Sequence, residues 1–229
     1  MTAPQSVFEG EHGVWNAVGK FDWPSFGGDS RPYRISGTQF KMYPAEYHGQ
    51  TPIEAAIALS PVDPDDVEAI VVETYWFAWS EIGNEPEKWA PTTRETADHS
   101  IPYLVCAALL DGKVDPASFT EARMKDPALR SLMQKVKVIH NKELDAFQPM
   151  SNPCRLKIRL NNGEERLSSV NHAKGYVNNP PSDQDLQQKL VNLNGGLLSS
   201  RRISKLIDLC WRFEELDDVR SVISEIRLK

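Results

Sequence analysis

Residues 41–56, KMYPAEYHGQTPIEAA, pass from a polar loop into an apolar helix. Thr51 suits the N-cap of that helix, Pro52 suits its first position, and the apolar run that follows ends before Pro61. A helix N-terminus carries backbone N–H groups without intrahelical partners and a partial positive charge. Residues 41–50 are therefore expected to lie where a carboxylate ligand binds favourably.

Four side chains in this loop, those of Lys41, Glu46, Tyr47 and His48, can bind an anion or move a proton. Beside a helix N-terminus, a cation together with an acid or base could hold a carboxylate and transfer a proton next to it. A solvated loop in which the glutamate only caps the helix explains the same residues. The composition of the loop leaves both interpretations open.

Strand and helix patterns follow this first helix. Residues 67–75, VEAIVVETY, are β-branched and apolar and predict a strand. In ADHSIPYLVCAALLDG, residues 97–112, apolar side chains recur at three- and four-residue spacing, with Asp98 as N-cap and Gly112 as the terminating residue. The next predicted elements are two short helices and a strand, at residues 116–123, 127–134 and 136–140.

The second half of the chain contains a hairpin and then only helices. Residues 154–170, CRLKIRLNNGEERLSSV, predict the hairpin, because apolar side chains alternate on both sides of the turn signal NNG. From residue 183 onward, apolar side chains recur at helical spacing in three segments. This order of elements predicts an α+β fold with mixed or antiparallel strands, followed by a helical tail. Residues 1–40, with a turn signal at 26–29, predict a loop-rich entry.

Composition excludes several classes of protein. A formal net charge of −6 over 229 residues argues against a general nucleic-acid or membrane-surface binder, so any anionic ligand needs a local group of cations. No apolar run approaches the roughly 20 residues that span a bilayer. The start MTAPQSVFEGEHGVW also lacks the order of a signal peptide. We therefore expect a cytoplasmic protein, with a mitochondrial address as the alternative.

The three cysteines, Cys106, Cys154 and Cys210, are far apart and lie in apolar or alternating sequence. This pattern predicts core positions in a reducing compartment. None of them belongs to a closely spaced pair of the kind that binds zinc or an iron–sulfur cluster. This absence removes an aconitase-type cluster from consideration.

Two further segments bring together groups that could bind a ligand. His99 and Tyr103 are four residues apart, so on one helix they would share a face and could both reach a ligand at its start. A structural role for both explains the spacing equally simply. His172 and Lys174 follow the hairpin and could supply cationic contacts to an acidic substrate, or belong to a solvated rim.

Residues 41–56 resemble the lysine, Phe-Pro-Ala-Glu, His, Gln-Thr, Glu-Ala-Ala pattern of 2-methylcitrate dehydratases in the MmgE/PrpD family. Three later segments are similar to the family in the same order, so the resemblance spans nearly the whole chain. The first carries its histidine and tyrosine, the second its basic loop before a helix, and the third its closing helix. They are residues 97–112, VNHAKGYVNNPPSDQDLQQKL (170–190) and LCWRFEELDDV (209–219).

The resemblance implies a large helical domain, built from both ends of the family's chain, and a smaller α+β domain between them. Here residues 1–35 would end the helical region, residues 36–177 would form the α+β domain, and residues 178–229 would return as helices that complete the helical domain. The active site of such enzymes lies between the two domains. The family's catalytic lysine, histidine and tyrosine match Lys41, His99 and Tyr103.

Substrate contacts are implied in the same way. Glu46 and His48 match the PAExH part of the motif, and His172 and Lys174 belong to the basic loop. The decarboxylase branch of the family usually has histidine where Glu46 stands, which favours the dehydratase branch. The implied chemistry uses no metal and no cofactor and acts on a tricarboxylate. A base removes the proton next to a carboxylate, an acid protonates the departing hydroxyl, and cations offset the charge that develops.

The family's preceding helical region has no counterpart in this sequence, so we expect half of the active site to come from elsewhere. The leading hypothesis is one half of a 2-methylcitrate dehydratase of propionate catabolism, either paired with an N-terminal-half partner or surviving as a truncated gene product, and forming a homodimer. The alternatives are a non-catalytic tricarboxylate-binding or assembly module, an epimerase or isomerase, and a cis-aconitate decarboxylase. Helix 201–213 is expected to expose an apolar face unless another chain covers it.

Overall fold

The computed structural model describes residues 6–11, 13–21, 33–194 and 196–227, and the chain separates into two units, Met1–Thr38 and Gln39–Lys229. In the first unit, the described residues form helix α1 (Val14–Val18) and a short 3-10 helix, η1 (Arg34–Gly37). Both are short, in keeping with a loop-rich entry. The turn predicted at 26–29 lies outside the described residues.

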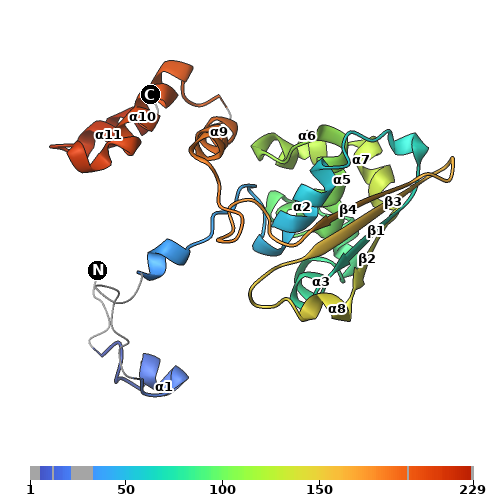
Figure 1. Cartoon of the computed structure of the whole chain (residues 1–229), viewed down its shortest axis with the longest axis horizontal. Helices are drawn as coiled ribbons and strands as arrows, with labels where there is room; N and C mark the ends of the chain where they lie inside the picture. The colour runs from blue at the N-terminus through green and yellow to red at the C-terminus, as the bar shows by residue number, and fades with distance from the viewer. Residues whose placement is uncertain (1–5, 12, 22–32, 195, 228–229) are drawn as a thin grey trace. The chain divides into compact units, whose positions relative to one another are not determined.

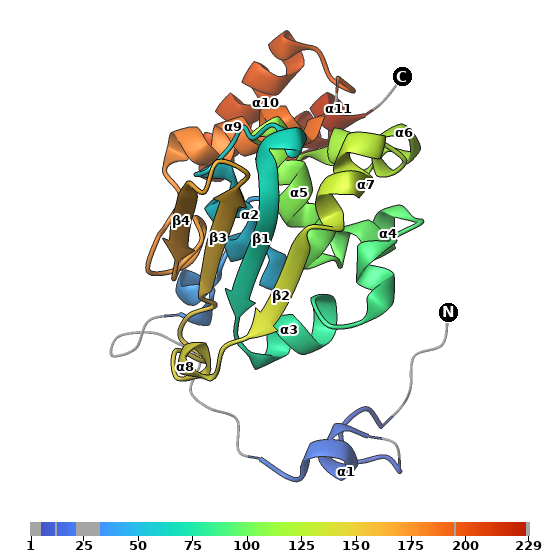
Figure 2. The same cartoon turned by 90° about the vertical axis from the view of Figure 1, so that its right-hand side faces the viewer.

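The second unit is built on a four-stranded sheet in the order β2-β1-β3-β4 (Figure 2). Strand β1 (Val67–Thr74) pairs in parallel with β2 (Val136–His140) and antiparallel with β3 (Cys154–Leu160), and β3 pairs antiparallel with β4 (Glu165–Val170). The sheet is therefore mixed. The α+β fold class and the predicted hairpin are confirmed.

Alternation along the strands gives the sheet a buried and an exposed face. In β3, the side chains of Cys154, Leu156 and Ile158 are buried, whereas those of Arg155 and Arg159 between them are exposed. Successive side chains of a strand point to opposite faces, so one face of β3 enters the core and the other carries charge. The exposed face lies toward the viewer in Figure 2, in front of the helices.

Helices α2 (Gln50–Ile57) and α5 (Ile101–Asp111) cover the buried face of the sheet and pack against each other (Figures 1 and 2). Residues 101–109 of α5 are all buried, and Ile53, Ala55 and Ala56 of α2 are fully buried. The other α-helices described in this part are α3 (Trp76–Ile82), α4 (Arg94–Asp98), α6 (Glu121–Met124), α7 (Pro127–Met133) and α8 (Lys142–Asp145).

The predicted start of the first helix is wrong by two residues. A short 3-10 helix, η2 (Tyr47–Gly49), runs directly into α2, whose N-cap is Gly49 rather than Thr51. The Thr51 hydroxyl is buried and donates to the carbonyl oxygen of Asn152 at 2.6 Å. The Thr51 hydroxyl thus makes a tertiary contact and does not cap the helix.

The predicted N-cap of α5 is also wrong. Asp98 is the last residue of α4, and the N-cap of α5 is Ser100, whose hydroxyl accepts the backbone N–H of Tyr103 at 3.1 Å. A break of two residues, His99 and Ser100, separates the helices. The other end of α5 is as predicted, because Gly112 adopts the left-handed conformation, with φ of 66°, that terminates helices.

Three helices end the described chain: α9 (Asp183–Asn194), α10 (Ser200–Trp211) and α11 (Arg220–Ile226). Helix α10 buries Ile203, Leu206 and Leu209 and packs against α11, so much of the apolar face expected to be exposed is covered within this chain. Trp211 and Phe213 remain exposed. Among the described residues, no helix has the length and apolar character needed to cross a bilayer.

The cysteine prediction holds for two of three residues. Cys106 and Cys154 are buried, and burial raises the pKa of both thiols. Cys210 is exposed, so its predicted core position is wrong. It neighbours Leu209 on the amphipathic helix α10 but lies outside the face that this helix buries.

Candidate active site

A groove of ≈ 510 Å³ brings together the loop of residues 41–46, helix α4 with the residue that follows it, and helix α9. Backbone contacts build it: the N–H of Glu46 donates to the carbonyl oxygen of Asp98 at 3.0 Å, which ties the loop to the end of α4. The lining residues are Lys41, Tyr43, Pro44, Ala45, Glu46, Arg94, Asp98, His99, Lys189 and Leu193.

The loop itself is held by the buried side chain of Gln50. Its amide oxygen accepts the N–H of Tyr43 at 3.1 Å, and its amide nitrogen donates to the carbonyl oxygen of Tyr43 at the same distance. The carboxylate of Glu46 accepts the backbone N–H of His48 at 2.6 Å. The capping role considered for Glu46 is therefore confirmed, and Glu46 also lines the groove.

His99 lies at the end of α4 with its imidazole oriented by two acceptors. Its Nδ1 is 3.0 Å from the carbonyl oxygen of Glu95 and is also paired with the carboxylate of Asp98. Because both partners are acceptors, Nδ1 carries the proton of the neutral ring and Nε2 is left as an acceptor. The side chain is 47% exposed. The His99–Asp98 pair lines the groove.

Cations reach the groove from three different elements. Lys41 comes from the loop, Arg94 from the first turn of α4 and Lys189 from α9. Within the described part of the chain, none of the three forms an ion pair with a carboxylate. Burial lowers the pKa of Lys189. A partly desolvated ammonium without a counter-ion gains most when an anion binds beside it.

Two of the predicted site residues point into the core instead. Nδ1 of His48 hydrogen-bonds to the buried Tyr75 hydroxyl. Tyr103 is fully buried, donates its hydroxyl to the carbonyl oxygen of Ser118, and has its pKa raised to about 12 by burial. The expectation that His99 and Tyr103 share a helix face is wrong, because α5 begins at Ile101 and His99 precedes it.

The basic loop after the hairpin lies outside the groove. Lys174 forms an ion pair with Asp185 at 3.1 Å, and its backbone N–H donates to Glu54 at 2.9 Å. His172 is half-buried, and its Nδ1 is buried without a hydrogen-bond partner among the described residues. The structure thus groups Lys41, Glu46 and His99 and does not add His172 or Lys174 to them.

Arg94 and Lys189 were missed from the sequence. Arg94 follows Thr93, which forms a capping box with Thr96, so the cap signal in TTRET could have placed the arginine at a helix start close to His99. No such signal marks Lys189, because an isolated lysine within an amphipathic helix is usually predicted to be exposed to solvent. Only the packing of α9 brings it to the loop. No cluster of metal-binding side chains occurs within the described ranges.

The start of α9, and with it Lys189, depends on Asp185. Hydrogen bonds from Ser182 and the ammonium of Lys174 hold the pKa of this carboxyl at about 2, below its usual 3.8. Because the folded-state pKa is the lower one, the stabilisation is complete above about pH 4 and is lost as the pH falls toward 2. We expect NMR titration of the Ser182 and Leu186 amides to show this transition.

Asp185→Asn is expected to remove that transition, while Asp183→Asn in the same turn leaves it in place. If Asp185→Asn showed the same transition, a group other than Asp185 would be responsible for it. No such dependence is expected above about pH 5, since the carboxyl is ionised there in both the folded and the unfolded state.

The second unit is thus an α+β domain with a groove in which Lys41, Arg94 and Lys189 lie near the His99–Asp98 pair. Residues 43–212 match the model of the MmgE/PrpD C-terminal domain. This match covers most of the chain, and the chain belongs to the MmgE/PrpD family. Lys41 lies two residues before the matched range, whereas Arg94, His99 and Lys189 lie inside it.

Curated relatives carry two named activities. Cis-aconitate decarboxylase of Mus musculus is 29% identical over 135 residues, and that of Homo sapiens is 29% identical over 129 residues, each match covering 56% of this chain and 26% of the relative. The 2-methylcitrate dehydratase of Cupriavidus necator is 30% identical over 108 residues, covering 44% of this chain and 22% of the relative.

The chain therefore aligns with about a quarter of the length of these relatives. Decarboxylases and dehydratases of this kind are lyases, and the substrates in both names are tricarboxylates. The relationship supports a lyase-type enzyme at the level of the family.

Proposed function

We propose that this chain carries the cationic, proton-accepting half of a lyase active site that dehydrates 2-methylcitrate or a related tricarboxylate. The observation that carries the proposal is the meeting of Lys41, Arg94 and Lys189, none of them ion-paired within the described residues, beside the oriented imidazole of His99. In this role the protein serves propionate catabolism in the cytoplasm and needs no metal.

The proposed reaction uses these groups in sequence. Nε2 of His99 takes a proton from the carbon next to a substrate carboxylate, and the electron pair of the broken C–H bond forms the double bond. The C–O bond at the neighbouring carbon breaks, and the departing hydroxide takes a proton to leave as water. The ammonium groups of Lys41 and Lys189 can donate that proton, and with Arg94 they stabilise the charge that develops on the carboxylate.

Tyr103 has a different role in this proposal. Its hydroxyl is buried against Ser118, and its ring stacks with Phe119 at a centroid distance of 6.1 Å. This contact fixes α5 against the segment that follows it. The residue therefore supports the groove from within the core and does not contact the substrate.

We propose that a helical domain, in the same or another polypeptide, completes the site. Two facts support this. The relatives are about four times as long as the aligned part of this chain. The C-terminal helices also leave large apolar side chains exposed, among them Trp211, Phe213 and Ile223. A homodimer is the assembly expected from the family.

Decarboxylation of cis-aconitate is the second candidate, because cis-aconitate decarboxylases are also among the relatives, at 29% identity over 56% of this chain. Assays with 2-methylcitrate, citrate and cis-aconitate separate the candidates, using the full chain alone and with an added N-terminal helical half of a family member. Water loss supports the dehydratase, and carbon dioxide release the decarboxylase. Inversion at a stereocentre of 2-methylcitrate would indicate an epimerase, and binding without turnover would indicate a non-catalytic module.

Lys41→Ala is expected to weaken citrate binding by the full chain about 10- to 100-fold, the usual range for losing a hydrogen bond between charged groups. Isothermal titration calorimetry measures the change. Lys137→Ala, which removes an exposed lysine from β2, is the matched control and should bind citrate as the unchanged chain does. Undiminished binding and turnover in Lys41→Ala would remove Lys41 from the site.

A further inference from the structure

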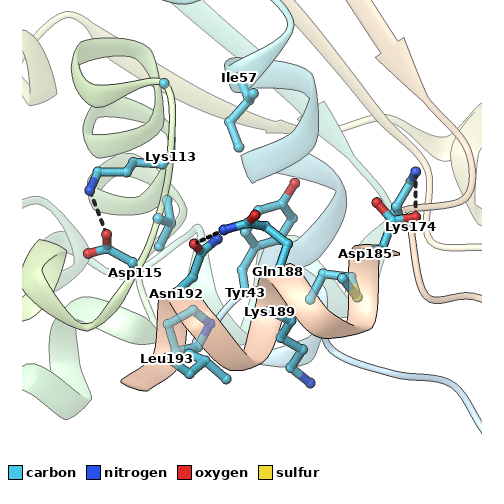
Figure 3. Close-up of a pocket in the computed structure, with 14 residues that line it drawn as sticks. Tyr43, Ile57, Lys113, Asp115, Lys174, Asp185, Gln188, Lys189, Asn192 and Leu193 are labelled. Atoms are coloured by element: carbon cyan, nitrogen blue, oxygen red, sulfur yellow. Dashed lines mark hydrogen bonds and ion pairs between the residues drawn. The ribbon is translucent and has the colours of Figure 1, made fainter. Parts of the chain in front are cut away.

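A second cavity, of ≈ 290 Å³, adjoins the groove and is closed on one side by α9 (Figure 3). The two spaces share four lining residues: Tyr43, Pro44, Lys189 and Leu193. They therefore adjoin at these residues. The second cavity extends from there toward Ile57 on α2 and toward the turn after α5 at residues 112–115.

The wall of this cavity is mainly apolar. Its carbon-rich lining comes from the loop, α2, the turn after α5 and α9, through the side chains of Met42, Tyr43, Pro44, Ile57, Val114 and Leu193. The charged groups at its two ends are already neutralised: Lys113 pairs with Asp115 at 2.7 Å and Lys174 with Asp185 at 3.1 Å (Figure 3). The other cation that lines the cavity, Lys189, also lines the groove.

The remaining polar groups also disfavour an anion. Burial, with the negative charges of Glu54 and Asp185, raises the pKa of Tyr43, so this phenol stays neutral. The Lys189 ammonium extends away from Ile57 in Figure 3. The amide of Gln188 donates to the side-chain oxygen of Asn192 at 2.8 Å. The cavity is thus the more apolar of the two spaces, and it shares Lys189, which has no ion pair among the described residues, with the groove.

We propose that this second cavity receives the alkyl substituent of a tricarboxylate whose carboxylates bind in the neighbouring groove. The inference rests on the proposed function and specifies its substrate class as 2-alkylcitrates. A methyl group fills only a small part of ≈ 290 Å³, so longer alkyl chains should bind better than methyl. Each buried methylene strengthens binding about fourfold, the equivalent of roughly 0.8 kcal/mol.

The test is a calorimetric series with the full chain and four ligands: propane-1,2,3-tricarboxylate, 2-methylcitrate, 2-ethylcitrate and 2-propylcitrate. We expect all four to bind and affinity to rise about threefold to fivefold per added methylene among the alkylcitrates. Equal affinities would overturn the alkyl cavity while leaving the anion groove in place. Failure of all four to bind would overturn the proposed function itself.

Variants that fill the cavity locate the alkyl chain. Asn192→Trp adds an indole from the exposed rim of α9, and Val191→Trp, an exposed neighbour that lines neither space, is its matched control. Ile57→Phe fills the cavity from the opposite wall. We expect both filling variants to bind the unsubstituted tricarboxylate unchanged and to lose the gain per methylene, which the control keeps. Retention of that gain in both filling variants would place the alkyl chain elsewhere and overturn the inference.

Discussion

Gly175→Ala is expected to lower the free energy of unfolding of the second unit by roughly 3–5 kcal/mol, which is larger than the effect of most point mutations. Gly175 has φ of 95°, a conformation that costs an L-residue about 1–2 kcal/mol. An added Cβ would also lie only 2.1 Å from the carbonyl oxygen of Phe40. The atom that the Cβ would meet belongs to the backbone of Phe40, and that backbone is held close because the N–H of Phe40 donates to the carbonyl oxygen of Gly175 at 2.9 Å. No side-chain rotation can relieve it.

Gly163→Ala is the matched control for this prediction. Gly163 has φ of 86° in the hairpin turn, and an added Cβ meets nothing within 4 Å. Its substitution should cost about 1–2 kcal/mol, the contribution of the backbone conformation alone. Urea denaturation of both variants measures the difference. Equal losses in the two would show that the Phe40 contact contributes nothing to stability.

The groove also depends on the loop that contains Gly175, although Gly175 does not line the groove. Its backbone fixes Phe40, the residue before Lys41, so the loop enters the groove from a defined point. The basic loop after the hairpin was predicted to contact substrate. In the structure its residues hold the Lys41 loop and α9 in place, and we infer an indirect role in the groove.

The fold could be predicted because its main elements are coded locally. Alternation in CRLKIRL, the turn NNG and the apolar run closed by Gly112 each specify an element without reference to distant residues. Helix starts were less predictable. Thr51 is used by a distant carbonyl oxygen, and Asp98 ends one helix just before Ser100 starts the next. Capping competes with tertiary contacts and with neighbouring helices, which a local pattern does not describe.

The residues of the candidate site were likewise predictable only in part. Lys41, Glu46 and His99 could be named from the sequence because they fall in motifs, and the groove contains all three. Motifs do not report side-chain direction, and His48 and Tyr103 face the core. The cations missed from the sequence come from elements that only packing brings together. Side-chain direction and helix docking are therefore what the structure adds.

His99→Gln is expected to reduce turnover by about 10²- to 10⁴-fold, the usual contribution of a general acid or base. Glutamine keeps a polar side chain of similar reach but accepts no proton at neutral pH. Because the groove's cations stay in place, tricarboxylate binding should change by less than about fourfold, so the loss falls on kcat and not on KM. The readout is dehydration of 2-methylcitrate under conditions in which the unchanged chain, with its completing helical domain, turns over.

His140→Gln is the matched control for this prediction, because the chain holds a second histidine–carboxylate pair. Nε2 of His140 is 2.8 Å from the carboxylate of Asp145, and its ring contacts Trp76, away from the groove residues. Its substitution should leave turnover within about twofold. Asp98→Asn should give an intermediate loss in kcat with an unchanged KM, since an amide can donate to Nδ1 and favour the wrong tautomer. Equal turnover in His99→Gln and His140→Gln would show that the imidazole at the groove transfers no proton, and the base would then have to come from the helical domain.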